Sequence, residues 1–298
     1  CSSEAELEIA PGVHSLPVGR GGFMGVYAPN VYLVGRGEAA LIDAGYADEA
    51  AVKDRLGQLA TLSLRPSTGS GAALSPSKGH RRLAYIVITP HHPDHVGGAA
   101  LVKEKTGARI ALHRLEAPLA GGQVGEPSQV RLLDDGETLE IGDLHLQVIH
   151  APGHSPGLIC LLLEEERILF TGDHVLGSGT TAIGPPLGDM AQYIESLRKL
   201  LRYDAGLICP GHGPVVKEPR RKLQELIQHR LEREAQVLAL LGQGKDTVKA
   251  LVAEIYPELD GRLHQMAQGQ VLAHLIKLER EGRVQGLVRG GEKAYRLL

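Results

Sequence analysis

Three histidines and one aspartate stand together in residues 88–98, which read ITPHHPDHVGG, directly after an apolar stretch. Imidazole nitrogens and carboxylate oxygens are ligands that proteins offer to divalent ions such as zinc. If a strand continued through this segment, His92 would project to one face and His91 to the other, because side chains alternate along a strand. The segment therefore predicts half of a metal site.

Further imidazoles and a carboxylate follow other apolar stretches, each beside glycine or proline. They lie in residues 151–157 (APGHSPG), 171–174 (TGDH) and 210–214 (PGHGP). Strands that end in tight turns hold side chains at the edge of a sheet with little freedom, as a preorganised metal centre requires. A lone histidine is more often structural, but four such segments in one chain favour a metal centre.

These motifs resemble the signature of the metallo-β-lactamase superfamily, Thr-His-x-His-x-Asp-His followed by a distant His, a bridging Asp and a last His. The resemblance spans about the first 216 residues. It implies a site that can take two ions. Asp94, His95 and His212 would bind the first ion, whereas His92 and His154 would help to bind the second, with Asp173 bridging the two.

One residue departs from that signature. Pro90 stands where the family places its first histidine, and proline has no donor atom. We expect partial occupancy by the second ion, since disturbing even an outer partner often costs about 10- to 100-fold in affinity. His91 and His174 are adjacent, but we leave both out of the ligand set. Strand alternation directs His91 away, and a residue next to a bridging aspartate is more often packed beneath the site.

The chemistry expected of such a site is metal-assisted hydrolysis. A divalent ion lowers the pKa of bound water from about 15.7 toward 7 and polarises a carbonyl or phosphoryl oxygen. We assign the catalytic role to Asp94, which would hold the water and move its proton. Zinc is expected, as one or two ions, because the ligands are rich in nitrogen; mixed His and Asp ligation also admits iron or manganese.

Strands and helices alternate in the part of the chain that carries these motifs. Strands are predicted at residues 31–34, 39–43 and 83–89, and a helix at residues 48–62. Residues 65–80, rich in Ser, Gly and Pro, interrupt the alternation and are predicted to be a flexible insertion. The alternation indicates a layered α/β fold. The family resemblance implies an αββα sandwich, with two mixed sheets between outer helices and the metals at one edge.

The pattern changes after residue 216. Helices are predicted at about residues 218–241, 247–255 and 263–281, followed by short apolar segments at residues 284–288 and 294–298. Helices that close on a two-stranded wing are typical of a winged helix. We therefore predict a catalytic domain at residues 1–216 and a helical, winged-helix-like domain at residues 217–298.

The C-terminal part narrows the resemblance to one family. Residues 176–181 (LGSGTT), the dipeptide His229-Arg230 and the segment that follows His274 resemble the β-lactamase-like protein 2 family, which includes a mitochondrial endoribonuclease. Similarity covers nearly the whole chain. The insertion at residues 65–80 and Pro90 are the departures.

Three functions remain open. The first is hydrolysis of a small-molecule ester, thioester or lactone. The second is endoribonuclease activity on single-stranded RNA, which the two-domain resemblance favours. Residues 217–298 carry 15 Lys and Arg against 11 Asp and Glu, a net charge of only +4, and aromatic residues make up 3% of the chain, which is little for a nucleic-acid module. The third is a metal-binding protein with reduced or lost catalysis, favoured by Pro90. The winged helix could instead close the active-site cleft or pack a homodimer.

Composition favours a cytoplasmic enzyme. Hydrophobic residues make up 43% of the 298, which is ample for a core, and no stretch approaches the roughly 18 apolar residues of a membrane span. Cys160 and Cys209 do not suggest a disulfide framework. Cys1 would fit a processed lipoprotein, but we do not favour membrane anchoring on that ground. Asn30 is the only asparagine, a bias typical of a thermophile or of a GC-rich genome.

Overall fold

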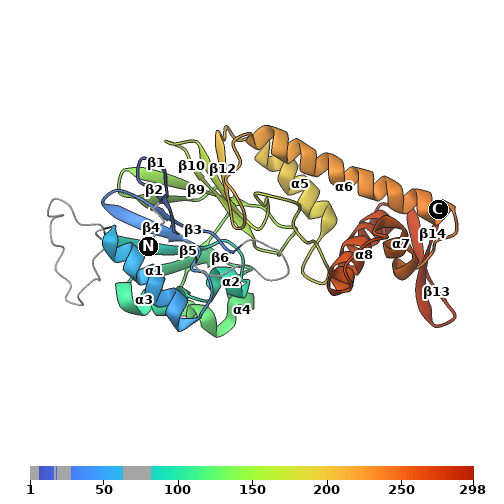
Figure 1. Ribbon diagram of the computed structural model, residues 1–298, viewed down its shortest axis with the longest axis horizontal. Coiled ribbons are helices and arrows are strands. Elements are labelled where there is room, and N and C mark those ends of the chain that lie inside the picture. The colour runs from blue at the N-terminus through green and yellow to red at the C-terminus, as the bar shows by residue number, and fades with distance from the viewer. Residues whose placement is uncertain (1–6, 17, 19–27, 63–81) are drawn as a thin grey trace. The chain divides into compact units, whose positions relative to one another are not determined.

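The computed structural model describes residues 7–16, 18, 28–62 and 82–298 (Figure 1). Cys1 and the insertion expected at residues 65–80 lie outside the described residues. The chain divides into two compact units. The first consists of Cys1–His150, Gly157–Gly179 and Asp204–Pro219, and the second of Ala151–Pro156, Thr180–Tyr203 and Arg220–Leu298. The domain boundary expected after residue 216 stays a prediction.

Two mixed β-sheets form the first unit. The seven-stranded sheet follows the chain order, with β1 (Leu7–Ala10), β2 (Val13–Leu16), β3 (Val31–Val34), β4 (Glu38–Ile42), β5 (Arg82–Ile88), β6 (Arg109–His113) and β7 (Arg131–Leu133). The five-stranded sheet has the order β12-β11-β10-β9-β8, with β8 (Thr138–Ile141), β9 (Leu144–His150), β10 (Ile159–Leu163), β11 (Ile168–Gly172) and β12 (Leu207–Pro210). β4 to β7 pair in parallel, as do β11 and β12, whereas the other pairs are antiparallel. Parallel strands end at one edge, where the motifs follow them.

Side chains alternate along the central strands and build two hydrophobic layers. In β5, Ile88 belongs to the layer that contains Val52 of α1 (Glu49–Thr61), whereas Val87 belongs to the layer that contains Phe170 of β11. The second layer draws on both sheets, so the sheets pack face to face. Burying an aliphatic side chain of this size stabilises a fold by about 1.5–3 kcal/mol, which fixes the register of each strand.

Short helices cover the first layer. α1 begins where the sequence predicts it, because Asp48 caps it by accepting a hydrogen bond from Ala51 N at 2.9 Å. The other helices of this unit are α2 (Pro93–Val96), α3 (Ala99–Thr106) and α4 (Ala117–Ala120), with 3₁₀ turns at Gly121–Val124 and Pro127–Gln129. α3 ends at Gly107, whose φ of +71° is the left-handed conformation that stops helices.

The second unit is helical and ends in a β-hairpin. It contains α5 (Met190–Leu200), α6 (Pro219–Gly242), α7 (Val248–Ile255), a 3₁₀ turn (Gly261–Leu263), α8 (His264–Arg280), β13 (Val284–Arg289) and β14 (Glu292–Leu297). Gly290 and Gly291, at φ +59° and +86°, form the two-residue turn of the hairpin. Val271 of α8, Leu251 of α7 and Tyr295 of β14 share one core. This arrangement agrees with the predicted winged helix.

Cys160 and Cys209 are the two cysteines among the described residues. Both are buried and free. A search of the described helices finds none that is long and apolar enough to cross a membrane.

Candidate metal centre

The first motif is a loop and a helical turn, not a strand. β5 stops at Ile88, and α2 begins at Pro93 with His92 as its N-cap. Proline suits this position because the first residues of a helix need no N–H partner. Strand alternation therefore does not decide how His91 and His92 point. The tight turn presents His92, Asp94 and His95 together at the end of the sheet.

A buried carboxylate that sequence reasoning missed holds this loop. Asp43 follows β4 and is 2% exposed. Its Oδ1 accepts a hydrogen bond from Thr89 N at 2.8 Å, and its Oδ2 accepts one from Thr89 Oγ1 at 2.7 Å. The same Oδ2 lies 2.7 Å from His95 Nδ1, so Nδ1 is the donor and Nε2 is the nitrogen left for a metal. Its only signal in the sequence is an acidic residue at the end of an apolar strand.

Asp94, His95 and His212 form the first ligand cluster. Each offers one ligand atom, and these atoms lie within 4.8 Å of one another. His212 Nε2 is 3.2 Å from Asp94 Oδ2 and 3.3 Å from Asp173 Oδ1. Asp173 Oδ1 is also 3.2 Å from His95 Nε2, so this carboxylate touches two members of the cluster.

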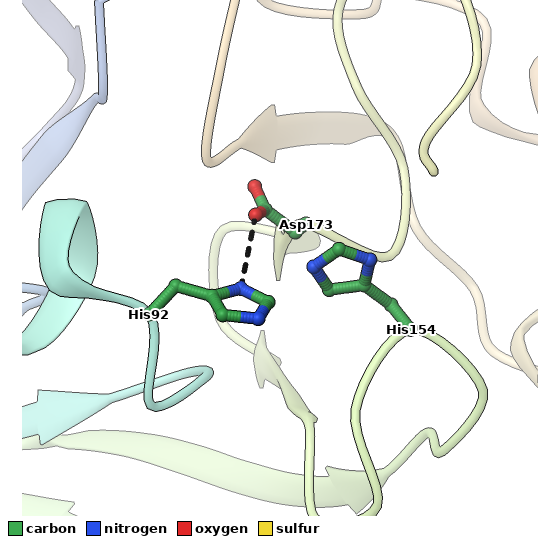
Figure 2. Close-up of side chains that lie close together, drawn as sticks. All are labelled: His92, His154 and Asp173. Carbon is green, nitrogen blue, oxygen red and sulfur yellow. Dashed lines mark ion pairs between the residues drawn. The ribbon is translucent and has the colours of Figure 1, made fainter. Parts of the chain in front are cut away.

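His92, His154 and Asp173 form the second ligand cluster, drawn in Figure 2. Their ligand atoms also lie within 4.8 Å of one another. The dashed line in Figure 2 joins His92 Nδ1 to Asp173 Oδ2, which are 3.8 Å apart. The two clusters together contain the six residues expected as metal ligands. Their binding of metal stays a prediction.

In the part of the chain that the structure describes, neither cluster includes His91, His174 or Pro90, which stands where the superfamily signature has its first histidine. Pro90 is buried and offers no ligand atom. His91 donates its backbone N–H to Glu116 Oε2 at 2.7 Å, and its ring Nδ1 lies 2.5 Å from the same oxygen. Glu116 is fully buried, and its Oε1 accepts a hydrogen bond from Gly157 N at 2.7 Å. His174 is fully buried as well and belongs to neither of the clusters found among the described residues.

Two glycines let the strand ends that carry Asp173 and His212 approach each other. Gly211 N donates to Gly172 O at 2.8 Å. A Cβ at Gly211 would lie 2.8 Å from His95 Cε1, and a Cβ at Gly172, where φ is +47°, would lie 2.4 Å from Thr89 Oγ1. A side chain at either position would push the ligand-bearing segments apart.

Asn30 holds the turn that carries His212. Its side-chain Nδ2 donates to Pro210 O at 2.9 Å and to Gly213 O at 2.8 Å. Its backbone N donates to Gly211 O at 2.7 Å. The backbone on both sides of His212 is thereby fixed, which restricts where the imidazole can point.

The electrostatics of the first cluster suit a cation. Burial would lower the pKa of His95, but the carboxylates of Asp173 and Asp43 outweigh it and raise that pKa well above its ordinary value. Burial would raise the pKa of Asp94, but the hydrogen bond with His212 and the charge of His95 lower it overall. Burial, together with the charge of Asp94, raises the pKa of Tyr46, whose hydroxyl therefore stays protonated near neutral pH.

The donor atoms fit a divalent metal ion. Within the described part of the chain, the buried His95 Nε2 makes no hydrogen bond. Asp173 Oδ1 lies 3.2 Å from this nitrogen as an ion-pair partner, and a buried polar atom that makes no hydrogen bond needs an explanation. A bound cation would satisfy it, and ligands of nitrogen and carboxylate oxygen suit zinc, iron and manganese.

Known protein families match both parts of the chain. The model of the metallo-beta-lactamase superfamily matches residues 24–212, and that of the beta-lactamase associated winged helix domain matches residues 247–289. A beta-lactamase-like protein 2 homolog of Caenorhabditis elegans is 30% identical, over 86% of this chain and 80% of the relative. An atrochrysone carboxyl ACP thioesterase of Aspergillus fumigatus is 30% identical, over 96% of this chain and 87% of the relative.

Solved structures match the fold over nearly the whole chain. A metallo-beta-lactamase family protein from Thermus thermophilus gives a TM-score of 0.74 at 27% identity, covering 97% of this chain and 99% of that one. A beta-lactamase domain protein from Burkholderia ambifaria gives a TM-score of 0.81 at 22% identity, covering 98% and 93%. The predicted resemblance and fold class are confirmed.

Proposed function

Because this chain belongs to the metallo-beta-lactamase superfamily and has the fold of hydrolytic enzymes, we propose that it hydrolyses an ester, thioester or lactone with a metal-activated water. The observation that carries the proposal is the grouping of three potential ligand atoms within 4.8 Å of one another in each of two clusters. We propose zinc as the metal, with one or two ions per chain and with iron or manganese as alternatives.

The metal ligands in this proposal are the residues of the two clusters: His92, Asp94, His95, His154, Asp173 and His212. When bound there, a divalent ion would lower the pKa of water toward about 7 and polarise the acyl carbonyl. Asp43 supports this by keeping the Nδ1 proton of His95 on the side away from the metal. The glycines at the strand ends and the Asn30 amide keep the spacing of the ligands.

Asp94 is the residue that we propose for proton transfer. Its lowered pKa keeps it ionised at neutral pH, so it can accept a proton from the attacking water. The bond from the water oxygen to the acyl carbon forms, the bond to the leaving oxygen or sulfur breaks, and the proton passes to that leaving atom.

A thioester is our first choice within this substrate class. The Aspergillus fumigatus relative is named a thioesterase and aligns with 96% of this chain, so both parts of the chain have counterparts in it. A small-molecule acyl group requires no extended binding groove.

Cleavage of single-stranded RNA is a second candidate, favoured by the winged-helix match, but the net charge of residues 217–298 is small for a nucleic-acid module. Basic groups on the wing are partly engaged, since Arg289 Nη1 lies 2.6 Å from Asp246 Oδ2 and Arg296 Nη2 lies 2.7 Å from Gln285 Oε1. Tyr295 of the wing is buried and offers no surface for base stacking. We therefore rank RNA below acyl substrates. A metal-binding role with reduced or lost catalysis, which Pro90 favours, ranks third.

Metal content and a substrate panel test these proposals. Protein purified without added metal or chelator is analysed for metal per chain, and then assayed on an acyl-CoA thioester, an aryl ester, a lactone and single-stranded RNA. We expect bound zinc and thioester hydrolysis that a chelator abolishes and zinc restores. Cleavage of RNA alone would replace the acyl proposal by the second candidate, and absence of metal after reconstitution would favour the third. A homodimer also stays a prediction, which sedimentation velocity tests.

A further inference from the structure

The turn that carries His154 is held by α5. Asp189, the N-cap of α5, donates its backbone N–H to Gly153 O at 2.8 Å. A Cβ at Gly153, where φ is +136°, would lie 2.4 Å from Tyr193 Cα, so the turn packs directly on the helix backbone. The Asp189 carboxylate pairs with Arg280 of α8. The position of the turn therefore depends on two helices of the second unit.

A backbone carbonyl fixes the ring of His154. Nδ1 lies 2.7 Å from Ala182 O. A carbonyl oxygen can only accept a hydrogen bond, so Nδ1 carries a proton. In this tautomer of the neutral ring the lone pair lies on Nε2, which is the form that binds a metal through Nε2. The position of one peptide group thus selects the tautomer of a proposed ligand.

The peptide groups on either side of Ala182 are held by side chains of α6 and α8. Gln270 Oε1 accepts from Ile183 N at 3.2 Å, and Gln270 Nε2 donates to Thr181 O at 3.2 Å. Arg230 Nη2 donates to the same Thr181 O at 2.7 Å, and Arg230 Nη1 lies 3.4 Å from Gln270 Oε1. Arg230 is only 2% exposed. Burying the charged guanidinium of Arg230 costs free energy, which its hydrogen bond to Thr181 O offsets only in part. This cost argues that the position of the loop is important.

We infer that Gln270 and Arg230 are positioning residues for His154. They fix the loop that contains Ala182, whose carbonyl in turn fixes the tautomer and the direction of the His154 ring. The inference rests on the proposed function, because it requires His154 to bind metal. It gives the helices of the C-terminal part a role in the second ligand cluster that needs no nucleic acid. Because Pro90 supplies no ligand, the second cluster has one ligand fewer than the superfamily signature provides. Correct placement of His154 therefore matters more in this chain.

Gln270→Met tests this inference with little risk to folding. Methionine has a similar length but makes neither hydrogen bond, and Gln270 is only partly buried. Gln268→Met, at an exposed position of the same helix, is the matched control. The metal-free full chain is titrated with zinc by calorimetry. We expect Gln270→Met to weaken the second binding step by about 10- to 100-fold and to leave the first step unchanged. The two lost hydrogen bonds should lower the melting temperature without unfolding the chain at the temperature of the titration. The ¹⁵N NMR signals of the metal-free His154 ring should shift away from the Nδ1–H tautomer.

A double-mutant cycle with His154→Ala separates positioning from a general structural effect. In the His154→Ala background, Gln270→Met should cause no further loss of metal affinity, because its effect acts through that ring. A loss that persists without His154, or that weakens both binding steps equally, overturns the inference. If His154→Ala weakens the second step but Gln270→Met does not, only the positioning role fails. If His154→Ala changes neither step, the ligand assignment in the proposed function fails, and the inference fails with it.

Discussion

Replacing Asp43 with asparagine measures how far one buried carboxylate controls the metal centre. Asp43 has a φ of +60°, which asparagine adopts more readily than most residues, so the backbone should not change. The side-chain oxygen can still accept from Thr89 N, but an amide nitrogen then stands 2.7 Å from His95 Nδ1. A hydrogen-bond donor at this position requires His95 Nδ1 to be the acceptor. The proton of the neutral ring then moves to Nε2, the nitrogen proposed to bind metal.

The size of the effect follows from these contacts. Loss of the partner that orients a metal-binding imidazole typically costs about 10- to 100-fold in affinity, equivalent to about 1.4–2.8 kcal/mol. The charged hydrogen bond to His95 also contributes to stability, by about 1.5–3 kcal/mol, because the groups are buried. Asp43→Asn should therefore bind zinc more weakly and should also melt at a lower temperature in the metal-free form.

Competition with a chromophoric chelator gives the zinc affinity of each variant. Asp48→Asn is the matched control, since Asp48 caps α1 and asparagine is an equally good cap. It should retain both zinc affinity and stability. Wild-type zinc affinity in Asp43→Asn would refute the view that the carboxylate selects the tautomer of His95.

Three other predictions can be tested separately. Pro90→His restores the missing imidazole and should increase bound zinc per chain, measured by elemental analysis; an unchanged ratio would reject the proposed effect of Pro90. Asp94→Asn should reduce hydrolysis of the best substrate by about 10²- to 10⁴-fold, and steady-state turnover near the wild-type rate would assign proton transfer to another residue. Burial, with the nearby charges of Arg230 and Lys277, lowers the pKa of His274 to about 3. In the unfolded chain the pKa of a histidine is about 6.5. As the pH falls from about 6.5 toward 3, the unfolded state therefore binds a proton that the folded state does not, and stability is lost. His274→Leu should lose less stability than wild type over that range in urea unfolding, and an equal loss would contradict this assignment.

Local patterns in the sequence were enough to predict the elements that build the fold. The apolar spacing predicted a helix at residues 48–62, and α1 spans Glu49–Thr61. The apolar segments at residues 284–288 and 294–298 predicted the two strands of the wing, which are β13 and β14. Both signals lie within a few residues of the structure that they specify. The strand predicted at residues 83–89 is β5, which ends at Ile88. Strand alternation therefore does not extend to His91 and His92, because Pro93 starts a helix.

The supporting residues of the site could not be predicted in the same way. Asp43 and Glu116 are acidic residues after apolar strands, a pattern that occurs throughout proteins, and their partners are far away in the sequence. Gln270 lies within an ordinary helical pattern, and only the structure shows that it contacts the loop before α5. His92, Asp94 and His95 are recognisable because their spacing is local, and the other three proposed ligands because each follows an apolar stretch in the order of the superfamily signature. The groups that orient them are scattered because only the folded chain brings them together.

The Asn30 amide makes the His212 turn sensitive to a chemical change of one group. Both hydrogens of its Nδ2 are directed to carbonyl oxygens, of Pro210 and of Gly213. Hydrolysis of this amide with age or heat would replace the donor by a carboxylate oxygen, and two attractions would become two repulsions. Asparagine is among the thermolabile residues, and this chain contains it only here. A thermolabile side chain therefore holds the turn that carries one of the proposed ligands, and deamidation at this single position would disturb the metal centre.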